Sequence, residues 1–265
     1  MWLAVSLWAC GGAGTAAQAD PEPVPAPVPA PAPVPEPASA PAPAEDPGPP
    51  PTPSVKSTET LTTRDGVALE ADLYLGEPGA AGVVLLHMIP PHWDRTSWPS
   101  VFVDALAAEG WNLCIPDRRG SGKSGGVAQD AYVGPKGAYD VEACVKRLEA
   151  HGLGKLGIVG ASNGTTSMLD YAALAEIEGL KKPDVVGFMT GGKYTESQSL
   201  VVTVEAIPAV FTYSSDEREW SAGLRDVSPK WVFHEYPGGD HGTKMFEKRP
   251  GVTKDLLRSL LKGLH

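Results

Sequence analysis

A serine stands between two glycines in the stretch GIVGASNGTTSM, residues 157–168. Gly160, Ser162 and Gly164 form the pattern G-x-S-x-G, which follows an apolar, strand-like run and precedes a helix-like segment. A tight turn from strand to helix strains the serine backbone and lifts its hydroxyl above the sheet, and side chains at the two glycine positions would collide with the neighbouring strand or helix. The N–H groups that open the helix would also favour an oxyanion nearby. The pattern therefore predicts that Ser162 is a nucleophile.

A serine hydroxyl needs a base that takes its proton. Three histidines follow Ser162 in the chain, namely His234, His241 and His265. His265 ends the sequence, and His234 lies in the strand-like run WVFHEY. His241 lies in the Gly-rich stretch PGGDHGTKMF directly after that run, where a loop can turn the ring toward the ends of the strands. We expect His241 to be the base.

The base in turn needs a carboxylate that orients its ring. Asp216 and Glu217 directly follow the strand-like run IPAVFTYSS. Asp216 is preferred, because it comes first after the run and its shorter side chain suits a fixed hydrogen bond. Glu217, and Glu196 after the run PDVVGFMT, remain alternatives, whereas Asp240 is expected to be a solvated loop residue.

The segments around these residues alternate between strand-like and helix-like patterns. TETLTTRDGVALEADLYLG predicts an antiparallel hairpin that turns at Asp65 and Gly66. We then expect strands in residues 82–89, 111–117, 155–162, 183–190, 207–215 and 228–239, and helices in residues 96–110, 137–152, 163–177 and 252–264. This alternation predicts the α/β class, with a doubly wound, mostly parallel sheet. Ligands bind at the carboxyl ends of the strands in such sheets.

Three further motifs accompany GASNG: LLHMIP at residues 85–90, IPDRRGSGKS at 115–124 and GGDHGTKMF at 238–246. Together they resemble the α/β-hydrolase superfamily over about residues 57–265. The second motif is similar to the family's Asp-x-Arg-Gly-x-Gly-x-Ser turn, and the first stands where the family usually has His-Gly. The resemblance implies an α/β-hydrolase fold and acyl transfer by a Ser-His-Asp triad.

By the same resemblance, the backbone N–H of Asn163 and one from the turn at Met88 and Ile89 would form the oxyanion hole. Met88 replaces the glycine that is usual there, so the sequence does not decide whether Met88 or Ile89 supplies the second N–H donor. Trp93 and Trp98 could line an acyl or aromatic pocket, or they could pack in the core.

The resemblance also narrows the subtype. About fifteen residues separate the strands expected at 183–190 and 207–215, which is too few for the helical cap that many members carry. The capless dienelactone hydrolase-like and carboxylesterase-like branch is the most similar, and a serine in place of a cysteine nucleophile favours ester hydrolysis. No cofactor is expected, and no metal either, because His92 has no second ligand at metal-binding spacing.

The expected function is therefore hydrolysis of small-molecule carboxylic esters, or thioesters, through an acyl-enzyme by a protein that acts as a monomer. The main alternative is a catalytically inactive surface lipoprotein that uses the same fold for binding. A peptidase of this fold is less favoured, because such enzymes commonly add a propeller or a cap.

The amino-terminal sequence suggests export. Residues 1–19 begin with MWLAVSLWACGGAG, which is apolar but too short to span a bilayer, and we expect a leader there. LWAC followed by glycine resembles a lipoprotein cleavage site, which would make Cys10 the lipidated residue, although Trp8 replaces a small residue and no Lys or Arg precedes the apolar run. We expect a periplasmic or outer-membrane-anchored protein that meets the membrane through this lipid. A plain export signal and a cytosolic protein remain alternatives.

Residues 20–56 form a Pro- and Ala-rich linker that holds most of the 27 prolines of the chain. Such a composition cannot build a packed core and favours extended polyproline II, which suits a tether between a lipid anchor and the domain expected at 57–265. Half of the net charge of −10 comes from the five acidic residues within the first 53 positions, which contain no Lys or Arg. No basic stripe or motif indicates a nucleic-acid partner.

Cys114 and Cys144 are the cysteines left if Cys10 is lipidated. An oxidising compartment could join them. Their strand-like and helix-like surroundings, WNLCIPD and VEACVKRLEA, favour instead two buried free thiols.

Overall fold

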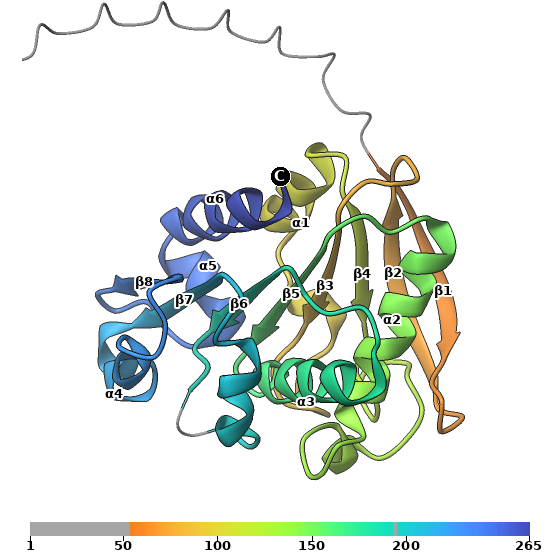
Figure 1. The fold of residues 1–265 in the computed structure, drawn as a ribbon, viewed down its shortest axis with the longest axis horizontal. Coiled ribbons are helices and arrows are strands. Elements are labelled where there is room, and N and C mark those ends of the chain that lie inside the picture. The colour runs from red at the N-terminus through yellow and green to blue at the C-terminus, as the bar shows by residue number, and fades with distance from the viewer. Residues whose placement is uncertain (1–53, 193–194) are drawn as a thin grey trace, which may run out of the picture. The chain divides into compact units, whose positions relative to one another are not determined.

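The structure, a computed structural model, describes residues 54–192 and 195–265. The leader, most of the linker and Cys10 lie outside the described residues. The described chain forms one eight-stranded, mostly parallel sheet with helices on both faces (Figure 1). This confirms the predicted doubly wound α/β fold. Among the described residues, no helix combines the length and the apolar character needed to cross a bilayer.

The strands lie in the order β1-β2-β4-β3-β5-β6-β7-β8. Their bounds are β1 Val55–Thr62, β2 Ala68–Leu75, β3 Gly82–Leu86, β4 Asn112–Pro116, β5 Leu156–Ala161, β6 Val185–Met189, β7 Ala209–Ser214 and β8 Trp231–Tyr236. The β1–β2 and β2–β4 pairs are antiparallel and all other pairs are parallel. The carboxyl ends of β3 to β8 therefore meet along one edge of the sheet.

Two layers of helices cover the sheet. The longer helices are α1 Ser100–Ala108, α2 Gly137–His151, α3 Gly164–Glu178 and α6 Gly251–Leu264, and the short ones are α4 Arg218–Ser221 and α5 Met245–Lys248. α2 and α3 pack on one face of the sheet, whereas α1 and α6 pack on the other (Figure 1). Crossover helices on both faces explain why the central strands read as continuous apolar runs.

The core follows from the alternation of side chains along buried strands. In β3, Val84 and Leu86 face the cluster beneath α2 and α3, while Val83 and Leu85 face the cluster beneath α1 and α6. All four side chains are completely buried. Each contributes on the order of 1.5–3 kcal/mol of transfer free energy, so both helical layers are held to the sheet largely by such contacts.

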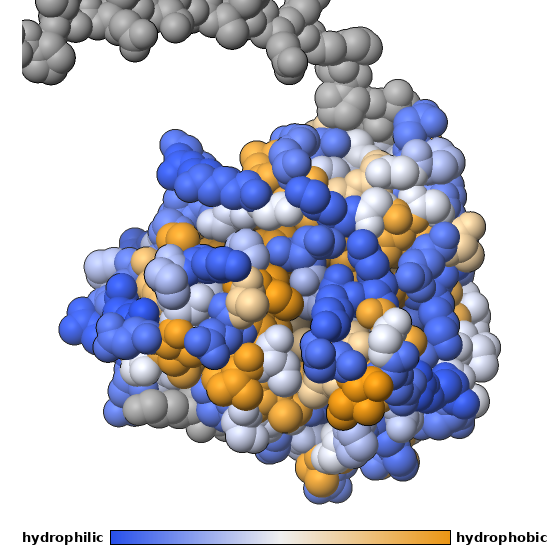
Figure 2. Space-filling view, in the orientation of Figure 1, coloured by the Kyte–Doolittle hydropathy of each residue, from blue (hydrophilic) through white to orange (hydrophobic). Residues whose placement is uncertain are grey.

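Hydrophobic surface on the described domain is dispersed on the face shown in Figure 2. Hydrophobic residues form several separate groups there, with hydrophilic residues between them. Scattered exposed apolar residues are normal for a globular domain and indicate no partner by themselves.

A disulfide joins Cys114 on β4 to Cys144 on α2, with 5.7 Å between their Cα atoms. The expectation of two free thiols is therefore wrong. Both residues are completely buried, because α2 packs directly on β4 and turns Cys144 toward the strand. The sequence placed each cysteine in the correct kind of element but could not show that these two faces meet.

The segment between β6 and β7 carries no large cap in the residues that the structure describes there, 190–192 and 195–208. It holds one short 3₁₀-helix, Gln198–Val204. The carboxyl edge of the sheet is thus left uncovered by any additional described domain, as predicted.

Candidate active site

Ser162 occupies the sharp turn between β5 and α3. Its φ of +51° lies in the left-handed region, which a non-glycine residue adopts only under constraint. The Ser162 N–H donates to the carbonyl of Met189 at the end of β6 (2.7 Å), and its carbonyl accepts from the N–H of Thr165 in α3 (3.0 Å). These bonds to the sheet and to the helix hold the strained turn in place.

The two glycines of the motif are required by close packing. A Cβ on Gly160 would lie 2.7 Å from the backbone nitrogen of Thr165, and one on Gly164 would lie 2.4 Å from the carbonyl oxygen of Leu86. Backbone atoms at such distances cannot move aside cheaply. The close packing predicted from the G-x-S-x-G pattern is therefore present. A side chain at Gly160 would collide with the following helix, and one at Gly164 would collide with β3.

Ser162, His241 and Glu217 form a continuous chain of hydrogen bonds. Ser162 Oγ lies 2.7 Å from His241 Nε2, and His241 Nδ1 lies 2.6 Å from Glu217 Oε1. Because a carboxylate can only accept, the proton on the imidazole lies on Nδ1, and Nε2 can accept from the serine hydroxyl. The rings of His241 and Trp220 are nearly perpendicular, with 6.2 Å between the ring centroids and an interplanar angle of 84°.

Asp216 does not occupy the position predicted for it. The chain enters a 3₁₀-helix, Ser215–Glu217, directly after β7, and neighbouring residues in such a helix point about 120° apart. Asp216 is consequently exposed, whereas the side chain of Glu217 is only 15% exposed and reaches the ring of His241. Glu217 Oε1 makes that contact, and Oε2 is buried without a hydrogen bond among the described residues.

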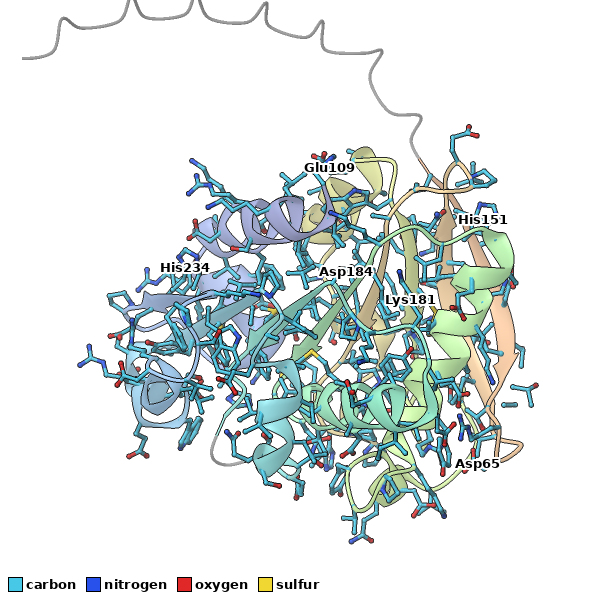
Figure 3. The ribbon with its side chains drawn as sticks, in the orientation of Figure 1. Asp65, Glu109, His151, Lys181, Asp184 and His234 are labelled. Atoms are coloured by element: carbon cyan, nitrogen blue, oxygen red, sulfur yellow. A yellow bond between two sulfur atoms is a disulfide. The ribbon has the colours of Figure 1, made fainter. Side chains whose placement is uncertain are left out.

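The other candidates for base and acid lie elsewhere. His234 is on β8 (Figure 3), and its Nδ1 lies 3.7 Å from Asp255 Oδ2. His265 lies beside Trp111 at the end of the chain. Asp240 accepts a hydrogen bond from the backbone N–H of His241 (2.7 Å) and so shapes the loop that carries the ring.

A pocket of about 260 Å³ opens beside the serine. Its lining residues are Ile89, Ser162, Asn163, Thr195 and Glu196. Two of the three residues expected to supply oxyanion donors, Ile89 and Asn163, therefore border the same space as the hydroxyl. The carbonyl of Ser162 points into α3, and a trans peptide directs the following N–H the opposite way, so the N–H of Asn163 faces away from the helix.

Met88 packs inward rather than lining this pocket. Its side chain is 2% exposed, and its Sδ lies so close to Gly242 that a Cβ there would be 2.4 Å away. Met88 thereby joins the turn after β3 to the loop of His241. The large residue in place of the family's usual glycine is accommodated because position 242 has no side chain.

The two tryptophans do not line the pocket of Ser162. Trp98 is 4% exposed and packs against Phe102 and Phe246, with ring centroids 5.9 and 6.2 Å away, so its place is in the core. Trp93 borders a separate groove of about 470 Å³ and carries the ammonium of Lys244 above its ring at 5.4 Å. Of the two alternatives, Trp98 therefore packs in the core, whereas Trp93 borders a groove other than the pocket of Ser162.

Glu196 gives the pocket an acidic wall. Its carboxylate oxygen Oε2 accepts a long hydrogen bond from Asn163 Nδ2 (3.5 Å). Burial raises the pKa of the nearby Asp170 to about 6, the charge of Glu196 adds to that rise, and a hydrogen bond from Ser197 and the charge of Arg118 oppose it. We find no Lys or Arg within ion-pair distance of Glu196 among the described residues.

Sequence reasoning missed two buried residues next to the site, His87 and Arg118. His87 Nδ1 donates to the carbonyl of Met88 (2.7 Å), and Nε2 accepts from the backbone N–H of Arg118 (2.8 Å). Burial lowers the pKa of His87 to about 3, so the ring is neutral. Arg118 stands at the variable position of the IPDRRGSGKS motif, which gave no reason to single it out.

The flanking residues of that motif brace the turn after β4. Asp117 Oδ1 accepts from the backbone N–H of Arg95 (2.9 Å), and Arg119 pairs with Asp140 and Asp65 (2.8 Å each). Among the residues that the structure describes, no cluster of three or more His, Cys, Asp or Glu side chains could hold a metal ion.

The strand order and a family model indicate the same fold for this protein. Residues 82–187 match the model described as "alpha/beta hydrolase fold". This match runs from β3 into β6 and includes the turn of Ser162, but it ends before Glu217 and His241. Together with the strand order, it shows that the chain has the α/β-hydrolase fold.

Solved structures support the same fold at low sequence identity. An esterase from Pyrococcus furiosus, Pf2001, is 17% identical with a TM-score of 0.64, covering 80% of this chain and 92% of its own. The esterase RhEst1 from Rhodococcus sp. ECU1013 is 14% identical with a TM-score of 0.61, covering 79% and 100%. A bromoperoxidase from Bacillus anthracis is 16% identical with a TM-score of 0.58, covering 77% and 99%.

A search of curated protein sequences found no match. The similar structures carry the names of more than one activity, and one fold hosts many reactions. The likeness thus defines the fold, and the reaction has to be argued from the side chains at the site.

Proposed function

We propose that this protein is a serine hydrolase that cleaves carboxylic esters. The observation that carries the proposal is the chain from Ser162 Oγ through His241 to Glu217, with 2.7 and 2.6 Å between the bonded atoms. A hydroxyl in hydrogen-bond contact with an imidazole, which a carboxylate orients, is the arrangement that activates serine for acyl transfer.

The reaction would proceed in two steps. Ser162 Oγ attacks the ester carbonyl carbon, and His241 Nε2 takes the hydroxyl proton and then gives it to the departing alcohol oxygen. A water molecule next attacks the acyl-enzyme and passes its proton to the same nitrogen, which returns it to Ser162 as the acid leaves. Glu217 keeps the proton of the imidazole on Nδ1 and stabilises the imidazolium that forms in each step.

The negative oxygen of each tetrahedral intermediate would be held by backbone N–H groups. Asn163 supplies one, from the turn that also carries the nucleophile. Ile89 is the better second donor, because Ile89 borders the pocket of Ser162 while the side chain of Met88 is packed in the core.

The size of the site favours small ester substrates over bulky ones. The pocket of about 260 Å³ suits a small acyl or alcohol group. Two of the similar structures are esterases. Within the superfamily, we place the chain nearest to the capless carboxylesterase-like members, since the described segment between β6 and β7 is short.

The test is hydrolysis of p-nitrophenyl esters of increasing acyl length. The protein should hydrolyse the short esters, and Ser162→Ala should lower kcat by about 10⁴-fold or more. Ser259→Ala is the matched control, because the described bond of Ser259 Oγ lies within α6, to the carbonyl of Asp255. Full activity in the Ser162 variant, or no hydrolysis of any ester by the folded protein, would overturn the proposal and favour a binding role for the fold.

We further propose that the protein works outside the cytosol. The Cys114–Cys144 disulfide supports this, because such bonds persist mainly in oxidising compartments. The apolar start of the sequence and Cys10 point the same way. Expression of the full chain in a Gram-negative bacterium should place it in the membrane fraction, and Cys10→Ala should release it. Equal distribution of both proteins in the cytosol would contradict this location.

A further inference from the structure

Arg118 is a completely buried arginine beneath the turn of Ser162. Its guanidinium donates to the carbonyls of His87, Met88, Ala131 and Asn163 and to the side chains of Asn163 and Ser167. No carboxylate forms an ion pair with it among the described residues. Oxygen dipoles of the backbone and of neutral side chains thus surround a cation in the interior.

This cation remains charged at neutral pH. Burial lowers the pKa of Arg118 to about 10, and the charges of Asp140 and Asp170 act on it only from beyond hydrogen-bond distance. A buried charge without a paired opposite charge is costly, so its surroundings must be organised around it. The hydrogen bonds of Arg118 hold two segments in place, and these are the two segments that carry the proposed oxyanion donors.

The first of these segments is the turn after β3. Nη1 of Arg118 binds the carbonyls of His87 (3.2 Å) and Met88 (3.3 Å), which belong to successive peptide groups. In a trans peptide the N–H points opposite to the preceding carbonyl. The N–H groups of Met88 and Ile89 are therefore both directed away from Arg118, and Ile89 borders the pocket of Ser162.

The second segment is the turn of the nucleophile. The same Nη1 binds Asn163 Oδ1 (3.1 Å), while Nη2 binds the carbonyl of Asn163 (3.4 Å) and Ser167 Oγ (2.8 Å) in the first turns of α3. One rigid, planar group consequently fixes the turn after β3 relative to the residue that supplies the other N–H donor.

We propose that Arg118 is a positioning residue for catalysis, which clamps the two halves of the oxyanion hole together and adds a fixed positive charge behind them. The inference rests on the proposed function. Preorganised dipoles and charges stabilise an oxyanion most strongly where water is excluded, and Arg118 has no exposed surface. The stabilisation applies to the tetrahedral intermediate more than to the neutral bound ester, so its loss should appear in kcat rather than in KM.

The first test compares Arg118→Met with the wild-type protein on one short p-nitrophenyl ester. We expect kcat to fall by about 10²–10³-fold and KM to change by less than about threefold. The affinity for a trifluoromethyl ketone, which captures Ser162 as an anionic hemiketal, should fall by a similar factor. A role in folding alone would lower the amount of folded protein without this selective loss.

The matched control is Arg119→Met. Arg119 is equally buried and adjacent in sequence, but its guanidinium pairs with Asp140 and Asp65. Among the described residues, it forms no hydrogen bond to either donor segment. We expect this variant to lose stability, while kcat per folded molecule stays within about threefold of wild type. An equal loss of kcat in both variants would mean that Arg118 only stabilises the turn after β4, as Arg119 does. That result would overturn the proposal.

Arg118→Lys distinguishes the effect of the positive charge from the effect of the hydrogen bonds to both segments. It also provides a test if Arg118→Met does not fold. An ammonium keeps the charge but cannot bond both segments in the planar geometry of a guanidinium. We expect an intermediate loss, on the order of tenfold in kcat, with a matching loss of ketone affinity. Unchanged kcat in this variant, or in folded Arg118→Met, would refute the inference while leaving the esterase proposal intact. An inactive wild-type protein would overturn both.

Discussion

Two adjacent carboxylates near His241 differ in one respect that matters for catalysis. Glu217 bonds Nδ1 of the ring at 2.6 Å, whereas Asp216 faces solvent. The difference arises from the 3₁₀-helix after β7, which rotates consecutive side chains apart. The sequence could show that an acid follows this strand, because the motif order requires one, but the direction of each side chain depends on a turn without a sequence signature.

The first prediction concerns this pair. Glu217→Gln should lower kcat by about 10³–10⁴-fold, because an amide can hold the ring with the wrong nitrogen protonated and cannot stabilise the imidazolium. Asp216→Asn should leave kcat within about twofold, since surface substitutions away from the site are nearly neutral. Steady-state kinetics on one ester decides the matter. If the Asp216 variant suffered the larger loss, the geometry at His241 would be wrong.

The second prediction concerns the acidic wall of the pocket. Glu196 borders the pocket of Ser162 without a nearby described cation, so esters that carry a carboxylate should be repelled. Glu196→Gln should raise kcat/KM for an anionic ester by about fivefold relative to a neutral ester of the same size, in keeping with roughly 1 kcal/mol at a partly exposed site. High salt should shrink the gain. An equal effect on both esters would show that substrate charge is not sensed there.

At the scale of elements, most of the fold was predictable because its signals are local. The apolar runs around Val84 and Ile158 are buried on both faces, and the leucines of α6 recur on one side of the helix. Trp98 shows the limit of this reasoning. Its position in the sequence suits a pocket or a core equally well, and only the packing against Phe102 and Phe246 distinguishes them.

The third prediction concerns the bond between β4 and α2. Cys114 and Cys144 are separated by 30 residues, and closing a loop of that length stabilises the folded state by about 3.5 kcal/mol in the chain-entropy model. Reduction should therefore lower the urea midpoint and the Tm. The double variant Cys114→Ala, Cys144→Ala is the control and should not respond to the reductant. A wild-type protein that is equally stable with and without reductant would argue against a structural disulfide.

The fourth prediction concerns the whole molecule and its response to acid. His87 is buried and neutral with a pKa of about 3, whereas the unfolded chain binds a proton on this ring below about 6.5. Because the unfolded state then holds more protons, stability falls as pH drops from about 6.5 toward 3. Between pH 7.5 and 5 this ring alone should cost about 2 kcal/mol.

The measurement is urea unfolding of the wild-type protein and of His87→Gln at both pH values. The glutamine cannot titrate, so the stability of the variant should fall less on acidification by about the amount given for the ring. Asp170 acts in the opposite sense, since its raised pKa makes protonation near pH 6 favour the folded state, but it is present in both proteins. Identical pH dependence in the two proteins would contradict a buried neutral His87.

On the same scale, the molecule brings together groups that lie far apart in the chain. Ser162 leaves β5, Glu217 follows β7 and His241 follows β8, and the parallel sheet places the three ends along one edge. The sequence could predict the serine and the loop of the histidine, because glycine patterns mark both. The buried cation Arg118 could not be predicted, because its role comes from four segments that meet only in the folded protein.

The most direct test of the central claim is covalent labelling with a fluorophosphonate, followed by mass spectrometry of the protein and its peptides. The wild-type protein should gain a single label, carried by the peptide that contains Ser162, and His241→Ala should slow the labelling by about 10³-fold or more. Absence of labelling in the folded protein, a label on another residue, or an undiminished rate in the His241 variant would contradict a nucleophile at Ser162 that His241 activates.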